Sequence, residues 1–464
     1  MLNLLERINE FVWGIPALIL ILGIGLYFTV STRFAQLRFF PEAMGSFIKQ
    51  LKKKERQKGK VSPYQALCTA LAATVGTGNI AGVAGAIALG GPGVIFWMWI
   101  CAILGMITKF AEATLAVRYR IKNADGEYVG GPMYMIQHGL GRRWKWLSEI
   151  YCFFAVIASF GVGNATQINA VIGGMNSMLV SFGVQESGML NFLIGVMLSV
   201  LIGSILLGGA RRIGQLAEHV VPFASAAYII LCIVVLTLRA SVIPEAFRLI
   251  IRGAFSPRAV TGGMLGSAFV ALRVGASRGV FTNEAGMGTA SIAHAAADVE
   301  HPVQQGFMGI MEVFLDTILI CTMTALVILC SGVTICYGND TGARLTVQGF
   351  SAVCGDWVSI PITLALCAFA IATILGWGLY GTRSAQYLFG DHVWKKFIYT
   401  QMVAVVLGSV LRTGTVWVIS EIVNGLMAIP NLICLAFLSP ELFRLLKEYR
   451  QIKVSGRLAS RSRR

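Results

Sequence analysis

Segments of about 20 predominantly apolar residues recur from Phe11 to Leu438, and this repetition restricts the possible folds more than any other feature of the chain. A helix of about 20 residues crosses a hydrocarbon core of roughly 30 Å. Because hydrocarbon offers the backbone no hydrogen-bond partner, such segments are expected to cross as α-helices. We therefore expect an all-α polytopic membrane protein with about eleven transmembrane helices. The predicted spans cover residues 12–30, 64–90, 93–119, 148–180, 188–207, 213–238, 260–297, 304–334, 359–389, 393–411 and 414–440.

The distribution of charge predicts how the chain lies in the membrane. Charged residues make up 13% of the chain, against roughly 25% in an ordinary soluble protein. A net charge of +16 would suit nucleic acid, but the basic residues fall in alternate loops, which the positive-inside rule places in the cytoplasm. We expect an inner-membrane protein that binds no nucleic acid, with its N-terminus outside and its C-terminus inside; the basic stretches 239–258 and around Arg412 oppose this orientation. The predicted cytoplasmic stretches are 49–60, 118–122, 142–145, 211–212, 395–396 and 447–464.

Several classes of site lack support in the sequence. The first span is too long for a signal peptide and is expected to be retained. The ten cysteines are scattered without metal-ligand spacing and suit small apolar core residues, although Cys336 and Cys354 share a predicted outer loop and could form a disulfide. No phosphate-binding loop, paired zinc-ligand motif or nucleophile elbow is present, so we expect neither an enzyme nor a bound cofactor.

Residues 76–82 interrupt the second span with three glycines and an asparagine. A helix broken at that depth leaves unpaired carbonyls on one half and unpaired N–H groups on the other. Carbonyls of residues 72–75 suit a small hard cation such as sodium, whereas the amides of Thr77, Gly78 and Asn79 suit a carboxylate. The break therefore predicts a site for an amino acid and a cation, unless the glycines only permit close helix packing.

The spans after the first divide into two groups of five. A short amphipathic helix at 245–255 separates the groups, and each group opens with an interrupted helix, at 76–82 and within 273–288. Because five is odd, the second group crosses the membrane in the opposite sense, the arrangement of an alternating-access transporter. The predicted parts are 1–60 (peripheral helix and basic cytoplasmic loop), 61–240 (first repeat), 241–258 (outer connector), 259–445 (second repeat) and 446–464 (basic tail).

Other polar residues within the spans are candidate ligands. Ala370, Thr373 and Trp377 share one helix face, so Thr373 suits a cation site and Trp377 could cap a bound side chain; alternatively, Thr373 bonds to its own helix and Trp377 packs in the core. Asn164 and Gln167 lie in mid-span and suit either substrate contact or interhelical bonding.

Charged residues within spans are expected to have functional roles or buried partners. They are Lys109, Glu112, Arg273, Arg278, Glu284, Glu312 and Asp316. We expect Arg278 to pair with Glu284 or Asp316, and the alternative is a proton relay through Glu312 or Asp316.

These motifs resemble those of the alanine or glycine:cation symporters, also called sodium:alanine symporters. The resemblance runs from about residue 10 to residue 445 and rests on GTGNIAGVA at 76–84, ALGGPG at 88–93, FWMW at 96–99, GGP at 130–132, FTNEAGMG at 281–288 and TILGW at 373–377. It implies a leucine-transporter-like fold of two inverted five-helix repeats plus one peripheral N-terminal helix. Residues 378–382 (GLYGT) are smaller and less charged than is common in the family, which puts side-chain selectivity in doubt.

Carried over by motif, the resemblance implies substrate contacts at Thr77, Gly78, Gln167 and Trp377, with further contacts near Gly275 and Phe281. It implies a sodium site formed by Ala72, Val75, Ala370 and Thr373.

The sequence thus predicts sodium-coupled uptake of a small neutral amino acid such as alanine or glycine, with sodium as coupling ion and no cofactor. The expected partners are that amino acid, sodium and membrane lipid, with no obligatory protein partner. The alternatives are a proton-coupled amino acid symporter, a channel, and a membrane enzyme or sensor that binds the ligand without moving it.

Overall fold

The computed structural model describes residues 2–52, 60–124, 126–181, 183, 185–256, 268–339, 342–411 and 414–455. Several predicted features therefore lie partly or wholly outside the described residues. They are most of the basic loop at 49–60, the start of the span at 260–297, Arg258, Arg412 and the tail from residue 456.

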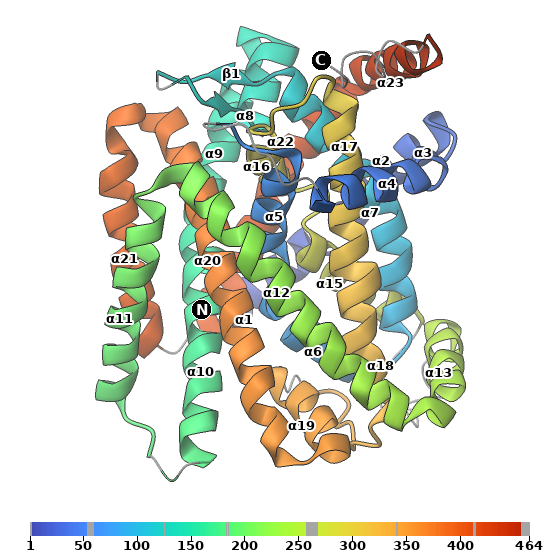
Figure 1. Ribbon diagram of the computed structural model, residues 1–464, viewed down its shortest axis with the longest axis vertical. Coiled ribbons are helices and arrows are strands. Elements are labelled where there is room, and N and C mark those ends of the chain that lie inside the picture. Colours follow the sequence, from blue (N-terminus) through green and yellow to red (C-terminus); the bar gives the residue numbers. More distant parts are fainter. Residues whose placement is uncertain are drawn as a thin grey trace.

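The described chain is almost wholly helical, as expected (Figure 1). Seven of its helices are long and apolar enough to cross a membrane, and an eighth span is the pair Pro63–Thr74 and Gly78–Gly90, which is bent by 53°. The multi-pass membrane protein is thus confirmed, whereas the total of about eleven spans stays a prediction.

The N-terminal segment consists of four helices on the edge of the bundle. They are α1 (Leu2–Val12), α2 (Ile15–Ser31), α3 (Ala35–Arg38) and α4 (Phe40–Lys52). The apolar helix α2 packs against α7 and leaves Ile19, Leu26 and Val30 exposed, as expected of a peripheral span whose outer face meets lipid.

The first group of spans runs from α5 to α12 and is followed by α13. Its elements are α5 (Pro63–Thr74), the π-helical turn η1 (Gly78–Gly82), α6 (Val83–Gly90), α7 (Val94–Arg118), β1 (Ile121–Lys122), β2 (Tyr128–Val129), α8 (Pro132–Met135), η2 (Ile136–Leu140), η3 (Arg142–Trp144), α9 (Lys145–Phe160), η4 (Gly161–Ala165), α10 (Thr166–Ser181), α11 (Gly188–Leu206), α12 (Gly209–Leu238), η5 (Ala240–Val242) and α13 (Ile243–Phe255). The two strands pair antiparallel in a short hairpin.

The second group runs from α15 to α22. Its elements are α15 (Ala268–Asn283), α16 (Thr289–His294), α17 (Pro302–Val313), η6 (Phe314–Cys321), α18 (Thr322–Cys330), α19 (Ala343–Cys354), η7 (Asp356–Val358), α20 (Ser359–Phe389), η8 (Asp391–Val393), α21 (Trp394–Val410), α22 (Gly414–Phe437) and the tail helix α23 (Ser439–Val454).

Local sequence explains where α5 begins. Ser62 and Gln65 form a capping box, in which the Ser62 hydroxyl accepts from the Gln65 amide at 3.1 Å and the Gln65 side chain accepts from the Ser62 amide at 3.0 Å. Pro63 occupies the first helical position, where its missing N–H costs nothing. The start of this half-helix is therefore fixed independently of the break at its other end.

The amphipathic helix α13 lies in the predicted connector and packs its small residues on the start of α7. A Cβ atom at Gly93 would lie 2.1 Å from the carbonyl carbon of Gly253, and the Trp97 indole donates to the Ala254 carbonyl at 3.3 Å. Only glycine permits this close approach of the two backbones.

One feature of the loop at 334–359 was not predicted, and a cysteine pairing that the sequence left open is not formed. Residues 334–359 read as a loop, yet they contain α19, in which Thr346 donates to the Ile80 carbonyl of the first break at 3.0 Å. Cys336 and Cys354 both carry free thiols, so the disulfide is absent from the structure.

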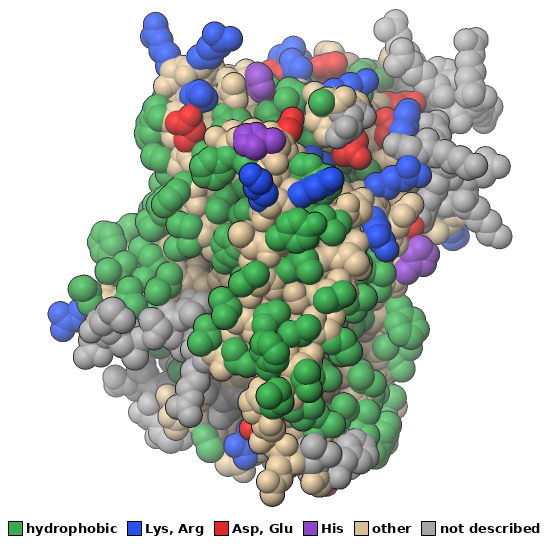
Figure 2. All heavy atoms as spheres, turned by 90° about the vertical axis from the view of Figure 1, so that its left-hand side faces the viewer, with side chains coloured by type: hydrophobic (Ala, Val, Ile, Leu, Met, Phe, Trp, Pro, Cys, Tyr) green, Lys and Arg blue, Asp and Glu red, His purple; other side chains and the backbone are tan. Residues whose placement is uncertain are grey.

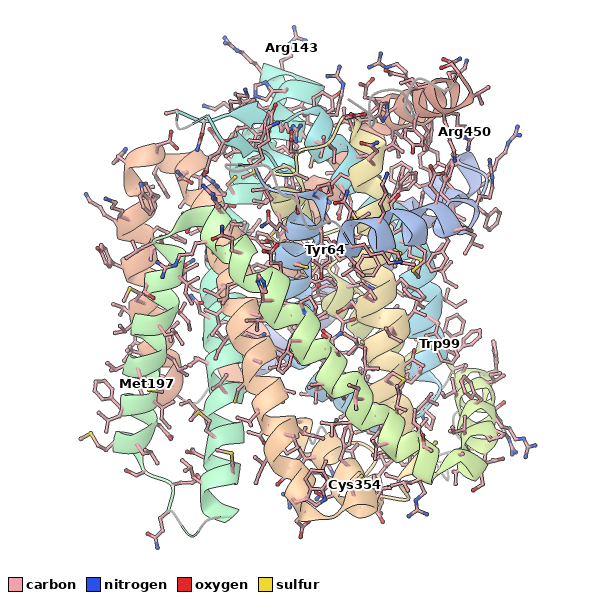
Figure 3. All side chains as sticks on the ribbon, in the orientation of Figure 1. Tyr64, Trp99, Arg143, Met197, Cys354 and Arg450 are labelled. Atoms are coloured by element: carbon pink, nitrogen blue, oxygen red, sulfur yellow. The ribbon has the colours of Figure 1, made fainter. Side chains whose placement is uncertain are left out.

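The two ends of the bundle differ in charge. Lys and Arg side chains gather at the end that carries β1, α8 and α23, above a broad hydrophobic belt (Figure 2), and we call this the basic end. Figure 3 shows Arg143 and Arg450 at the basic end and Cys354 at the opposite end, which we call the α19 end. Within the basic end, ion pairs from Arg444 and Arg118 hold the pKa of Glu441 in α23 below its usual value.

Candidate functional site

The first break leaves free backbone groups of both kinds. Helix α5 ends at Thr74, and Val75 has an extended conformation. The carbonyls of Ala72 and Val75 accept no hydrogen bond from any described group, and the amides of Thr77 and Gly78 donate none. These groups have the polarity that the sequence predicted: carbonyl oxygens suit a cation and amides suit a carboxylate.

Asn79 closes the break instead of projecting from it. Its side-chain oxygen accepts from the Gly76 amide at 2.9 Å, and its side-chain nitrogen donates to Asp316 Oδ1 at 2.6 Å. Its backbone amide points to the Gly76 carbonyl at 3.4 Å. Asn79 therefore ties the broken segment to η6, and its own amide is less available to a ligand than those of Thr77 and Gly78.

Three other elements converge on the first break. The Thr77 hydroxyl donates to Gln167 Oε1 in α10 at 3.2 Å, and a Cβ atom at Gly76 would lie 2.6 Å from Thr373 Oγ1 in α20. A Cβ atom at Gly78 would lie 3.7 Å from the Phe281 ring in α15. Four of the predicted substrate contacts and the predicted Thr373 ligand thus lie around one short stretch of backbone.

Thr373 and Ala370 lie on the face of α20 that packs against α5. The Thr373 hydroxyl donates to the Phe369 carbonyl of its own helix at 3.0 Å, which confirms the predicted back-bond and leaves the lone pairs of its oxygen free to bind a cation. Ala370 is fully buried one turn earlier, but its carbonyl belongs to an unbroken helix. The freest carbonyls for a cation are therefore those of Ala72 and Val75.

Trp377 is fully buried and bonded to the second break. Its indole Nε1 donates to Glu284 Oε1 at 3.0 Å, and a Cβ atom at Gly163 would lie 2.5 Å from Trp377 Cβ. Glu284 has a positive φ of 52° and also accepts from the Thr289 hydroxyl. The carboxylate thus fixes the position of the indole beside the second break.

Two predicted substrate contacts have different surroundings. Asn164 lies fully buried in η4, and neither atom of its side-chain amide has a hydrogen-bond partner among the described residues. Gly275 lies in the contact between α15 and α7, where a Cβ atom would be 2.7 Å from Trp97 Cβ. Asn164 therefore has a buried amide without a described partner, and Gly275 lies in a close helix contact; their roles as substrate contacts stay predictions.

The second break is held by a carboxylate to which the sequence analysis assigned no specific role. Glu112 Oε1 in α7 accepts from the amides of Gly286 and Gly288, each at 3.0 Å, and from the Asn431 side chain at 2.7 Å. Asn431 in turn donates to the Gly286 carbonyl at 2.9 Å. The freed backbone is thus satisfied by protein groups, which is how broken helices persist at membrane depth.

The buried charges pair differently from the prediction. Arg278 lies 3.5 Å from Glu421 in α22, so its predicted pairing with Glu284 or Asp316 is wrong. Glu312 pairs with Lys109 at 3.0 Å, and its other oxygen meets His294 at 2.8 Å. Glu421, Asn431 and His294 were missed because each meets its partner only through the fold; a polar residue in an apolar span was the one available signal.

Two cavities lie along the bundle, and the larger one reaches a neighbour of a site residue. One of 310 Å³ is open at the basic end, reaches Gly378 next to Trp377, and is lined by Glu127 and Arg383, whose ion pair measures 3.1 Å. The other, of 140 Å³, is lined by Leu89, Arg278 and Glu421 and lies towards the α19 end.

Comparisons with known proteins agree with this architecture. A profile described as the sodium:alanine symporter family matches residues 1–462. The chain is 42% identical over 454 residues to an uncharacterised transporter of Haemophilus influenzae (97% of this chain, 96% of that one). It is 40% identical over 459 residues to the sodium/alanine symporter AgcS of Methanococcus maripaludis (97% and 98%).

A solved structure has the same fold. The crystal structure of MhsT in complex with L-phenylalanine matches with a TM-score of 0.60 at 15% identity, over 82% of this chain and 90% of that one. The fold is therefore that of the leucine-transporter-like membrane transporters. From the match along nearly its whole length, the chain belongs to the sodium:alanine symporter family.

Proposed function

We propose that this transporter is a sodium-coupled symporter that takes up a small neutral amino acid, such as alanine or glycine, by alternating access. The observation that carries the proposal is the set of free backbone groups at the first break. Unbonded carbonyls at Ala72 and Val75 lie beside unbonded amides at Thr77 and Gly78. A cation and a carboxylate can be held there side by side, each by groups of opposite polarity.

The cation site that we propose uses Ala72, Val75, Ala370 and Thr373. Support comes from the Thr373 hydroxyl, which lies beside Gly76 and retains lone pairs beyond the hydrogen bond that it donates. Oxygen ligands of this kind suit a small hard cation. Sodium is then the coupling ion, and the proposed mechanism needs no other cofactor.

The substrate site that we propose is formed by Thr77, Gly78, Asn164, Gln167, Phe281 and Trp377. The amides of Thr77 and Gly78 would bind the carboxylate, and the unpartnered amide of Asn164 would bind a further polar group. Phe281 and Trp377 would enclose the side chain. Phe281 lies beside the first break and Trp377 bonds to the second, and we expect the space between them to suit a small side chain.

We propose that the basic end faces the cytoplasm, which sets the N-terminus outside and the C-terminus inside an inner membrane. The amino acid and sodium then enter from the α19 end and leave through the 310 Å³ cavity. The two breaks, one at the start of each predicted repeat (61–240 and 259–445), would form the central site, around which such transporters rock one helix bundle against the other.

Coupling requires that sodium raise the affinity for the amino acid and that the amino acid raise the affinity for sodium by the same factor. One sodium ion moving down a membrane potential supplies about 2.3 kcal/mol per 100 mV. This energy can concentrate a neutral amino acid on the cytoplasmic side.

The test is uptake of radiolabelled alanine into liposomes that contain the purified protein, with an inward gradient of either sodium or choline at fixed pH. We expect accumulation above equilibrium only with sodium. Equal accumulation with both cations, abolished when a proton gradient is collapsed, would instead support proton coupling, which the contact of Asp316 with Asn79 would allow. Binding of alanine without uptake would contradict transport and support a sensor.

A further inference from the structure

A buried chain of side chains links the middle of α7 to the first residue of α5. Lys109 Nζ donates to Glu312 Oε1 at 3.0 Å, and Glu312 Oε2 meets His294 Nε2 at 2.8 Å. His294 Nδ1 meets Gln305 Nε2 at 2.7 Å, and the same Gln305 nitrogen donates to the Pro63 carbonyl at 3.4 Å. All four side chains are fully buried, and the proposed substrate and cation sites include none of them.

The hydrogen bonds define the protonation of His294 in this structure. Gln305 Nε2 can only donate, and it faces two acceptors, His294 Nδ1 and the Pro63 carbonyl. His294 Nδ1 is therefore unprotonated, and Nε2 carries the proton and donates it to Glu312 Oε2. The imidazole is neutral, while Gln305 Oε1 is buried without a hydrogen-bond partner among the described residues.

A proton added to Nδ1 would reverse this contact. The new N–H would face the amide nitrogen of Gln305, and two donors cannot bond to each other. Rotation of the Gln305 amide by half a turn would bring Oε1 to the imidazolium and give that oxygen its missing partner. The same rotation would place Oε1 instead of Nε2 next to the Pro63 carbonyl, so that an attraction becomes a repulsion between two acceptors.

Pro63 belongs to a short segment that fastens α5 to the end of α16. Lys60 pairs with Asp298 at 2.9 Å, and the Asp298 amide donates to the Val61 carbonyl at 2.8 Å. Gln305 adds a third contact, a hydrogen bond to Pro63, the first residue of the helix. Tyr64 marks this start of α5 in Figure 3. Loss of the Gln305 contact would therefore weaken the attachment of the half-helix that leads to the first break.

The charged groups around His294 come from the helices packed against it. Helix α7 contributes Lys109 and Glu112, α17 contributes Glu312, and Glu284 lies in the break before α16. Helices α5 and α8 carry no acidic or basic residue, only Tyr64, Cys68 and Tyr134 as titratable groups, and the one charged residue of α20, Arg383, pairs with Glu127.

We propose that His294 is a proton-binding site and that its protonation, through Gln305, releases the start of α5. A lower pH at the basic end then favours opening of the half-helix α5. The inference rests on the proposed function only in treating α5 as a moving part. It is tested on the purified protein without substrate, so that its failure and a failure of sodium-coupled transport remain distinguishable.

The experiment is hydrogen exchange of the solubilised protein at about pH 5.5 and about pH 8, either side of the range in which histidine side chains ionise. Peptides covering residues 60–74 are followed by mass spectrometry, and rates are corrected for the pH dependence of chemical exchange. In the wild type we expect protection of α5 to fall about tenfold at the lower pH, the size of one lost hydrogen bond. An unchanged corrected protection would overturn the proposal.

Three variants test whether His294 and Gln305 cause the pH effect on the protection of α5. His294→Gln keeps a donor for Glu312 and gains no proton, and Gln305→Met keeps the histidine but removes the rotating amide; we expect both to abolish the pH effect. His219→Gln, at an exposed histidine of α12, is the matched control and should behave as the wild type. If His294→Gln does not fold, Gln305→Met decides alone. A pH effect that survives in Gln305→Met, or in a folded His294→Gln, would assign it to another group and contradict the proposal.

Discussion

The indole Nε1 of Trp377 donates a hydrogen bond of 3.0 Å to Oε1 of Glu284, across 93 residues of sequence. Glu284 lies in the second break, and Trp377 lies one turn beyond Thr373 on α20. The bond therefore joins the break of the second group to α20 of the same group, one turn from Thr373. Since the carboxylate is buried, the loss of this donor should be costly.

Trp377→Phe tests the contribution of this bond. It keeps an aromatic ring over the site but removes the donor, so we expect the apparent affinity for alanine to fall about tenfold or more, the usual size for a bond to a charged group. The measurement is the KM of sodium-driven uptake. Trp99→Phe is the matched control, because it removes an indole donor that bonds Thr322 at 2.8 Å outside the proposed site, and it should leave KM unchanged. Equal KM values for Trp377→Phe and the wild type would contradict this role.

Glu112→Ala tests how the second break is held together. The change would leave the amides of Gly286 and Gly288 without their acceptor, at about 1 to 3 kcal/mol for each buried group. We expect a markedly lower unfolding temperature, measured by the loss of monodisperse protein after heating. Glu112→Gln keeps an acceptor oxygen, so its unfolding temperature should lie between those of the wild type and Glu112→Ala. If Glu112→Ala unfolds at the wild-type temperature, the carboxylate does not hold the break.

Asn164→Ala distinguishes substrate contact from structural bonding. The Asn164 amide is buried without a described partner, so its removal should not destabilise the protein, whereas a ligand that binds it should lose affinity. We expect a higher KM for alanine at an unchanged or raised unfolding temperature. Asn176→Ala, on α10, is the control and should change neither quantity. A lower unfolding temperature with normal KM would identify Asn164 as a structural residue.

The ion pair of Glu127 and Arg383 is expected to restrain opening of the basic end. Partly exposed pairs contribute about 0.2 to 1 kcal/mol, so each single charge reversal should raise access to the 310 Å³ cavity severalfold. Access is measured as the alkylation rate of a cysteine placed by Thr382→Cys, resolved from the native cysteines by mass spectrometry. The double variant Glu127→Arg with Arg383→Glu should return to the slow rate. A double variant as fast as the single ones would exclude the pair as a restraint.

The sequence predicted the breaks well because the signal is local. Glycines and an asparagine in an apolar segment require broken backbone, and the resulting free carbonyls and amides follow from helix geometry alone. The meeting of Thr77 with Gln167 and of Gly76 with Thr373 followed from the family resemblance, since nothing in the spacing of these residues brings their helices together.

The long-range partners of the polar residues could not be predicted. Arg278 was expected to pair with Glu284, six residues away, yet it meets Glu421 on a distant span. For Asn79 only the backbone amide was given a role, and the bonds of its side chain to Gly76 and Asp316 were not predicted. In both cases several partners of suitable chemistry exist, and only the packing of helices selects among them.

Sodium coupling in the proposed mechanism depends most on the cation site at Thr373. The measurement is the affinity of the purified protein for alanine as a function of sodium concentration, with Thr373→Val and, as the control, Thr382→Val. Thr382 lies on the same helix and donates to the Gly378 carbonyl in the same way. We predict that sodium strengthens alanine binding in the wild type and in Thr382→Val, and that Thr373→Val needs far more sodium for the same effect. An unaltered sodium response in Thr373→Val would contradict the proposed site.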